Sequence, residues 1–339
     1  MGVAAGHRRV RLGLLAAGLG LLAWLPTGAS AHTLAHDDPV SPASGAAPRP
    51  CGFLAYDAAH PPTYQHVVVI MDENLSPSQL TATTAPYLTS LKSACGREGF
   101  MHAATHFSDP NYAAATSGLT TSAGAMTAHD NVFHQAQVAG DSWRAYEESM
   151  PRACGNGDPP YDTYHDPAHW YSDLRTPTNT CATHDLPLAP ALADDLAAHV
   201  LPTYAWITPN DCHNMHWVSG CTEPRTQAIQ TGDAWLGQIV SQIVASPSYR
   251  AGRTLVFITW DEGSGHATRG VDCTDPKVYT AQASCRIPTY VLSAYVRPGS
   301  RDTSDQNLYS LLATTEDVLG YPRLGRAVGV PNMRRTLGF

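Results

Sequence analysis

The chain has 339 residues, a formal net charge of −8 at pH 7 and 43% hydrophobic residues. The negative charge argues against a nucleic acid as partner, and the sequence shows no basic patch suited to an anionic membrane. The length suffices for one large domain with a substantial core. Eight cysteines are present, but no C-x-x-C spacing occurs, which argues against a zinc ribbon.

The N-terminal residues have the pattern of an export signal. A basic start precedes an apolar run at residues 12–25, and the triplet Ala29-Ser30-Ala31 follows. This order predicts a signal peptide over residues 1–31, with Sec and twin-arginine export both open. Residues 32–60, rich in Ala, Pro and Ser, are expected to be a flexible leader, and residues 61–339 a single domain. We therefore predict a secreted protein of the extracellular or periplasmic space, without a stable membrane anchor.

An even number of cysteines in an exported chain favours disulfide bonds. The cysteines fall into pairs of neighbours along the sequence, so that each bridge would staple one loop. The predicted pairs are Cys51–Cys95, Cys154–Cys181, Cys212–Cys221 and Cys273–Cys285.

Hydrophobic patterning predicts strands alternating with helices. Apolar runs predict buried strands at residues 66–71, 203–208, 254–260 and 287–293, with a shorter extended piece at 99–105. Helices are expected at 84–94, 111–117, 142–149, 231–244 and 307–319, the last ending at Gly320. Residues 154–190 are expected to form a long loop excursion over the carboxyl edge of the sheet. The predicted fold class is α/β, with a mostly parallel central sheet and helices on both faces.

Two of the expected strands end in carboxylates. Asp72, Glu73 and Asn74 follow the first strand, and Asp261 and Glu262 follow a later one. Ligands of open α/β sheets bind beyond the carboxyl ends of the strands. Clustered carboxylates repel one another unless a cation lies between them. The pattern favours a metal site, although two unrelated solvated strand ends remain the alternative.

Ser108 is the candidate nucleophile. It stands just before Pro110, a candidate helix start whose backbone N–H groups favour an anion. A serine hydroxyl that touches a metal can lose its proton and attack phosphorus. A plain N-cap or turn residue is the alternative. The G-x-S-x-G elbow of the α/β-hydrolases is absent.

Five segments resemble, in order, the motifs of the phosphoesterase family that includes bacterial acid phosphatases and phospholipases C. That family belongs to the alkaline phosphatase superfamily. The segments are HVVVIMDEN at 66–74, THFSDPNY at 105–112, ITPNDCHNMH at 207–216, TWDEG at 259–263 and YSLLATTED at 309–317. They span about residues 65 to 325. Each motif alone is weak, but five in the same order are specific.

The resemblance implies a role for each matching position. Glu73, Asn74, Asp261 and Glu262 would hold one divalent cation, with Ser108 as a further ligand and as the nucleophile. Oxygen ligands suit Ca, Mg or Mn better than Zn, and the sequence leaves the identity among these four open.

The same resemblance implies roles around the substrate. Asn111 would hydrogen-bond a phosphoryl oxygen, and His106, His165 and His216 would bind phosphate oxygens or protonate the leaving group. A structural role stays open for each histidine. The resemblance thus implies a pocket for a small phosphorylated substrate, with a phospholipid and an inositol phosphate among the candidates.

Three positions depart from the family pattern. Asn214 stands where the family has Asp, Leu308 where it has His, and Phe107 where it has Pro. The first two would deplete a second metal site. The resemblance implies a metal-dependent phosphatase that hydrolyses phosphomonoesters through a phosphoseryl intermediate. The alternatives are a phosphodiesterase of phospholipase C type and a non-catalytic protein that binds phosphate ligands on the same scaffold.

Overall fold

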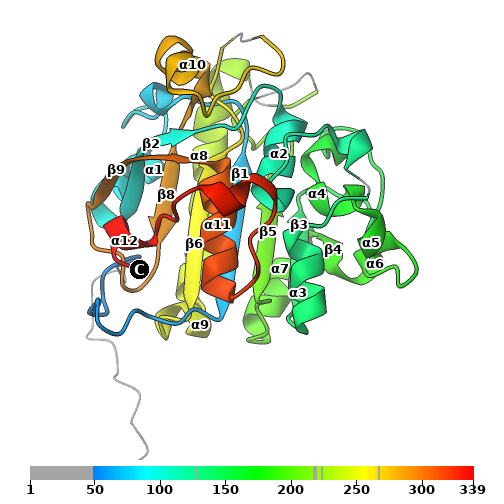
Figure 1. Ribbon diagram of the computed structural model, residues 1–339, viewed down its shortest axis with the longest axis horizontal. Helices are drawn as coiled ribbons and strands as arrows, with labels where there is room; N and C mark the ends of the chain where they lie inside the picture. The colour runs from blue at the N-terminus through cyan, green and yellow to red at the C-terminus, as the bar shows by residue number, and fades with distance from the viewer. Residues whose placement is uncertain (1–48, 127, 217–219, 223, 266–267) are drawn as a thin grey trace, which may run out of the picture. The chain divides into compact units, whose positions relative to one another are not determined.

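The computed structural model describes residues 49–339 apart from 127, 217–219, 223 and 266–267. Its centre is a nine-stranded sheet (Figure 1). The strands are β1 His66–Asp72, β2 Gly96–His102, β3 Trp143–Glu147, β4 Asp185–Pro187, β5 Tyr204–Thr208, β6 Thr254–Trp260, β7 Arg286–Ile287, β8 Thr289–Leu292 and β9 Arg301–Asn307. The predicted signal peptide at residues 1–31 lies outside the described residues.

The sheet runs in the order β4-β3-β5-β1-β6-β8-β2-β7, with β9 paired to β2. Strands β4, β3, β5, β1 and β6 pair in parallel, whereas β8 pairs antiparallel with both β6 and β2. All residues of β6 and all but the first of β1 are buried. The predicted mostly parallel α/β sheet, with strands covered on both faces, is therefore confirmed.

Helices cover the sheet on both faces. In Figure 1, α11 lies in front of β1 beside α2, and α8, which packs against α1, lies behind the sheet. The helices are α1 Pro86–Ala94, α2 Ser108–Ser117, α3 Val132–Ala139, α4 Pro167–Trp170, α5 Ser172–Arg175, α6 Cys181–His184, α7 Leu188–Ala197, α8 Ala228–Ala245, α9 Pro247–Arg250, α10 Pro276–Ala281, α11 Leu308–Leu319 and α12 Arg334–Leu337. Among these described helices, none is both long and apolar enough to cross a bilayer.

Several elements differ from the sequence-based expectation. Residues 142–149, expected to be helical, contain β3, because Trp143 and Tyr146 are buried in a strand held between β4 and β5. The strand expected at 287–293 divides into β7 and β8 on either side of Pro288. Strand β9 was not predicted, since its mostly polar and exposed residues carry no apolar pattern.

The segment expected to be a leader, residues 32–60, is described from residue 49 onward. Cys51 is fully buried and bridged to Cys95, and the backbone N–H of Leu54 donates to the carbonyl of Ala294. Residues 51–54 are therefore attached to the domain rather than part of a flexible leader. All four disulfide pairings predicted from the sequence are confirmed.

Candidate active site

The carboxyl ends of β1 and β6 lie side by side, because the two strands pair in parallel with Asp72 opposite Trp260. The backbone N–H of Asn74 donates to Asp261 Oδ1 over 2.8 Å, and that of Asp261 donates to the carbonyl of Asp72 over 3.0 Å. Glu73 and Asp261 are fully buried. The sheet thus joins the two acidic strand ends into one cluster.

Ser108 is the first residue of α2, the ten-residue helix that follows β2. Its hydroxyl donates to Glu73 Oε2 over 2.9 Å. Asn74 Nδ2 lies 2.6 Å from the same oxygen and 3.5 Å from Ser108 Oγ. Because Ser108 is partly exposed while Glu73 is buried, the hydroxyl stands at the accessible side of the acidic cluster, at a helix end that favours anions.

The acidic cluster carries more negative charge than its surroundings neutralise. Burial raises the pKa of Glu73, and the nearby Glu262 raises it further. Burial also raises the pKa of Asp261 well above its ordinary value, with Glu73 and Glu262 adding to the effect. Glu73 Oε1 and Asp261 Oδ2 are buried and make no hydrogen bond. A divalent cation held by Glu73, Asn74, Ser108 and Asp261 fits this oxygen-rich set, because it would neutralise the charge and bond the orphaned oxygens.

Glu262 faces His106. Glu262 Oε2 lies 2.5 Å from His106 Nδ1, and the two side chains are only 8% and 5% exposed. The sequence assigned Glu262 to the metal and His106 to the substrate pocket, whereas the structure pairs them with each other. The charge of Glu262 still raises the pKa of Glu73 and of Asp261, so it lies within electrostatic reach of the cluster.

His165 reaches the cluster from the short helix before α4. Its Nε2 lies 3.4 Å from Glu73 Oε1, and its Nδ1 lies 3.8 Å from Asp211 Oδ1 and 3.9 Å from Asp162 Oδ2. The ring stacks on Tyr112 with centroids 5.5 Å apart. The structure therefore brings His165 to the edge of the cluster. A carboxylate oxygen lies within 3.4 to 3.9 Å of each of its ring nitrogens.

Asn111 bonds the backbone instead of facing the cluster. Its Oδ1 accepts the N–H groups of Ala104 and Thr105, and its Nδ2 donates to the carbonyls of Thr105 and Phe107. Both amide protons are used and the side chain is fully buried. In this conformation Asn111 has no donor left for the phosphoryl oxygen that the sequence assigned to it, and it holds the loop that carries Ser108.

His216 lies on the loop after β5, with an exposed side chain and its backbone N–H bonded to Asn214 Oδ1. Its role at the substrate stays a prediction. Sequence reasoning did not select Asp211, which is 3% exposed and lies beside His165. The signal was available, because Asp211 follows β5, the other parallel neighbour of β1, in the way that Glu73 and Asp261 follow their strands.

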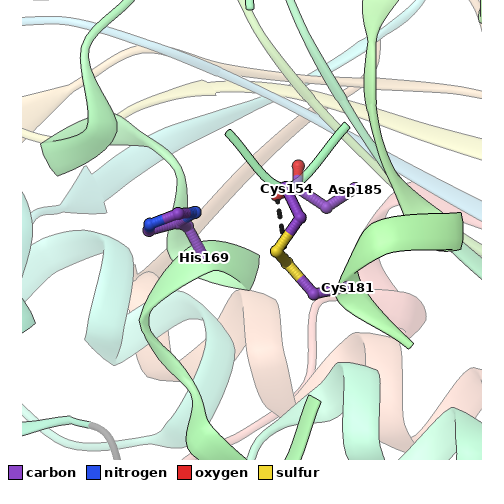
Figure 2. Close-up of side chains that lie close together, drawn as sticks. All are labelled: Cys154, His169, Cys181 and Asp185. Carbon is purple, nitrogen blue, oxygen red and sulfur yellow. Dashed lines mark hydrogen bonds between the residues drawn. A yellow bond between two sulfur atoms is a disulfide. The ribbon is translucent and has the colours of Figure 1, made fainter. Parts of the chain in front are cut away.

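Other groups of metal-ligating side chains occur among the described residues. Figure 2 shows Cys154, His169, Cys181 and Asp185 close together in the excursion before α7. The two sulfurs are joined in a disulfide, so neither can act as a thiolate ligand. Asp185 also approaches the buried carboxylates of Glu147 and Asp166. The Ser108 hydroxyl instead donates to Glu73, which makes the Glu73 cluster the candidate catalytic centre.

The profile of the Phosphoesterase family matches residues 78–322. The chain belongs to this family. As a phosphoesterase, it is an enzyme that hydrolyses phosphoric esters. The sequence resemblance to acid phosphatases and phospholipases C is thereby confirmed at the level of the family.

Curated relatives of this phosphoesterase include phosphatases. It is 28% identical over 281 residues to a phosphatidylinositol-3-phosphatase of Mycobacterium tuberculosis, covering 80% of this chain and 82% of the relative. It is 25% identical over 243 residues to an acid phosphatase of Aspergillus fumigatus, covering 66% of this chain and 48% of the relative. The chain therefore spans about half the length of that fungal enzyme.

Solved structures show the same fold. A protein of the alkaline phosphatase superfamily from Vibrio parahaemolyticus superposes with a TM-score of 0.53 at 14% identity, over 84% of this chain and 74% of the other. A phosphonate monoester hydrolase of Agrobacterium radiobacter gives a TM-score of 0.51 at 14% identity, over 81% and 77%. At such identities the likeness establishes the fold of this phosphoesterase alone.

Proposed function

We propose that this phosphoesterase is a secreted, metal-dependent phosphatase that hydrolyses phosphomonoesters through a phosphoseryl intermediate at Ser108. The observation that carries the proposal is the 2.9 Å hydrogen bond from Ser108 Oγ to Glu73 Oε2, beside oxygens that fit a divalent cation. The family and its phosphatase relatives support phosphoric ester chemistry. Four disulfides support an oxidising compartment.

The residues suggest how each step would proceed. A bound divalent cation would supply charge stabilisation at the phosphoryl oxygens and favour the deprotonated serine. Ser108 Oγ forms the new bond to phosphorus as the ester oxygen leaves, and its proton has an acceptor in Glu73 Oε2. Water then attacks phosphorus, the bond to Ser108 Oγ breaks, and the serine regains a proton. The N-terminal end of α2 favours the phosphate anion throughout.

The histidines would handle the leaving group. His165 is the first candidate, because it reaches Glu73 with Nε2 while Asp211 lies beside Nδ1 and can orient the ring. His106 is paired with Glu262 and would influence the charge of the acidic cluster. His216, which is exposed, would bind phosphate oxygens or protonate the leaving group from the surface of the site. Asn111 is proposed as a positioning residue that holds the loop before Ser108.

The substrate class follows from the relatives. The mycobacterial relative is a phosphatidylinositol-3-phosphatase, which makes a phosphorylated inositol lipid the first natural substrate to assay. A phosphodiesterase of phospholipase C type is the alternative within the same family. The intact set of Glu73, Asn74, Ser108 and Asp261 supports an enzyme over a non-catalytic phosphate-binding protein.

The test is turnover of p-nitrophenyl phosphate and of bis(p-nitrophenyl) phosphate, with and without a chelator. We expect the monoester to be the better substrate. We also expect activity to disappear when a chelator is added and to return when a divalent metal salt is added back. Rapid acid quenching should trap phosphate on Ser108. Preference for the diester would favour the phospholipase alternative, and full activity in chelator would refute metal dependence.

A further inference from the structure

A pocket of about 260 Å³ lies at the antiparallel side of the sheet, next to α1. Four of its lining residues are cations: Lys92, Arg97, Arg286 and Arg301. They belong to α1, β2, β7 and β9, which the fold brings to one edge of the sheet (Figure 1). We call this the basic pocket. The sequence did not predict this pocket, because Arg286 and Arg301 lie far along the chain from Lys92 and Arg97 and the net charge is −8.

Among the residues that the structure describes, none of the four cations forms an ion pair with a carboxylate. The arginines that form ion pairs among the described residues are Arg144, Arg323 and Arg326, so no carboxylate oxygen lies within 4.0 Å of a basic-pocket nitrogen. Three of the four instead donate to backbone carbonyls. Lys92 Nζ donates to Leu80, Arg97 Nη1 to Lys92 and Arg286 Nη2 to Gly99, over 2.7 to 2.8 Å. These bonds orient the side chains without neutralising their charge.

Local packing positions the two arginines nearest the edge. The guanidinium carbons of Arg286 and Arg301 lie 4.7 and 5.9 Å from the centroid of the Phe100 ring. Arg301 crosses β2 at Gly99, where a Cβ would collide with its guanidinium. Arg286 Nε is buried without a hydrogen-bond acceptor. Stacking on Phe100 therefore orients the guanidinium groups of Arg286 and Arg301 without neutralising them.

The acids near the basic pocket do not cancel this charge. Glu98 lines it and is only 6% exposed, and burial together with Asp302 raises its pKa well above the ordinary value. Even an ionised Glu98 would place only one negative charge against the four cations that line the pocket. Asp305 lies near Arg286 but outside ion-pair distance, and it accepts a hydrogen bond from Tyr279. The net charge of the pocket is therefore positive.

We propose that the basic pocket binds the phosphate group of a phosphorylated ligand, as an anion site separate from Ser108. Arginine guanidinium groups match phosphate oxygens in two parallel hydrogen bonds, and three arginines, Arg97, Arg286 and Arg301, line this pocket. The site goes beyond the proposed catalytic function and does not depend on Ser108 chemistry.

The basic pocket is connected to the candidate active site through the sheet. Thr289 in its wall lies 2.7 Å, Oγ1 to Oγ1, from Thr259, which precedes Asp261 by two residues. Pro77, also in the wall, follows Asn74 by three residues. The basic pocket and the Ser108 cluster are therefore built on neighbouring strands of the sheet.

Equilibrium dialysis of the full chain against inorganic phosphate tests this site. We expect wild type to bind one phosphate more per chain than the combined variant Arg97→Gln, Arg286→Gln and Arg301→Gln. The single variant Arg301→Gln, which removes an exposed side chain, should weaken that extra site at least about tenfold. The matched control is Arg250→Gln, because Arg250 also stacks on an aromatic ring, Phe53, and also lacks a carboxylate partner.

The outcomes separate this proposal from the catalytic one. If the Ser108 cluster binds no phosphate, wild type should bind one ion and the combined variant none, which still supports the basic pocket. Equal phosphate binding by wild type, Arg301→Gln and the folded combined variant would overturn it. Turnover of p-nitrophenyl phosphate should stay unchanged in all of these variants.

A second arm identifies the source of the phosphate group. Vesicles of phosphatidylcholine with and without phosphatidylinositol 3-phosphate are sedimented with wild type and with the variants. Loss of binding to the phosphorylated vesicles in Arg301→Gln would assign the pocket to a lipid headgroup. Unchanged vesicle binding together with weakened inorganic phosphate binding would assign it to a soluble phosphate. Both results support an anion site.

Discussion

Ser108 Oγ and Glu73 Oε2 lie 2.9 Å apart, so a hydroxyl at the start of α2 donates to a carboxylate at the end of β1. The two residues are 35 positions apart in the sequence. Their contact exists because β2 delivers the chain to the same end of the sheet at which β1 stops.

Ser108→Ala should abolish turnover and leave the fold intact. Loss of the nucleophile should lower kcat by at least about three orders of magnitude. The free energy of unfolding should change by less than about 1 kcal/mol, because a single partly exposed hydroxyl is removed. Activity on p-nitrophenyl phosphate and thermal melting measure the two effects. Ser241→Ala, on the exposed side of α8, is the matched control and should keep full activity. A variant that retains a tenth of wild-type activity would exclude Ser108 as the nucleophile.

The catalytic centre should hold one divalent cation per chain. Asn214 donates to Asp211 over 3.4 Å, and Leu308 is a fully buried side chain at the start of α11. Neither supplies the charged or imidazole ligand of the family pattern, which weakens a second catalytic site. Metal analysis of dialysed, active enzyme should give one equivalent, and Asp261→Asn should lose it. Two equivalents that are both required for activity would contradict this assignment.

Asn111→Ala should reduce stability and activity together. The substitution removes four hydrogen bonds to the loop at residues 104–107, which should cost about 2 to 4 kcal/mol of unfolding free energy. Asn131→Ala is the control, because Asn131 is equally buried and caps α3 away from the loop. It should lower the melting temperature without changing kcat. If Asn111→Ala instead raises KM at unchanged stability, Asn111 contacts the substrate directly.

Glu316→Gln should remove a pH-dependent loss of stability. Glu316 is fully buried in α11, and burial raises its pKa to about 8, above the ordinary glutamate value of 4.5. The folded state therefore prefers the neutral carboxyl, so stability is highest below about pH 4.5 and falls as pH rises towards 8. Relative to Glu316→Gln, wild type should lose on the order of 2 kcal/mol between pH 5 and 8, measured by urea unfolding. A constant difference between the two proteins over that range would show that Glu316 does not titrate on unfolding.

The candidate site was largely predictable because its parts are local. Glu73 and Asp261 each follow an apolar run directly, and parallel pairing of these runs was enough to expect the carboxylates together. Ser108 stood in a recognisable motif at a helix start. The direction in which each side chain points was harder to predict from the sequence. Glu262 faces His106, and Asn111 bonds the backbone. Those choices depend on hydrogen-bond partners contributed by segments remote in sequence.

The sequence by itself determined the buried strands β1, β5 and β6, the cysteine pairs and the carboxylates that end β1 and β6. Apolar runs, cysteine spacing and local charge are properties of short stretches. Tertiary structure decided the rest. Residues 142–149 became β3 because β4 and β5 supply hydrogen bonds on both sides, overriding a local helical preference. The basic pocket exists only in the fold, since Arg97, Arg286 and Arg301 meet across three strands. The pairing of strands that are distant in sequence brings such side chains together, and no local sequence pattern predicts this pairing.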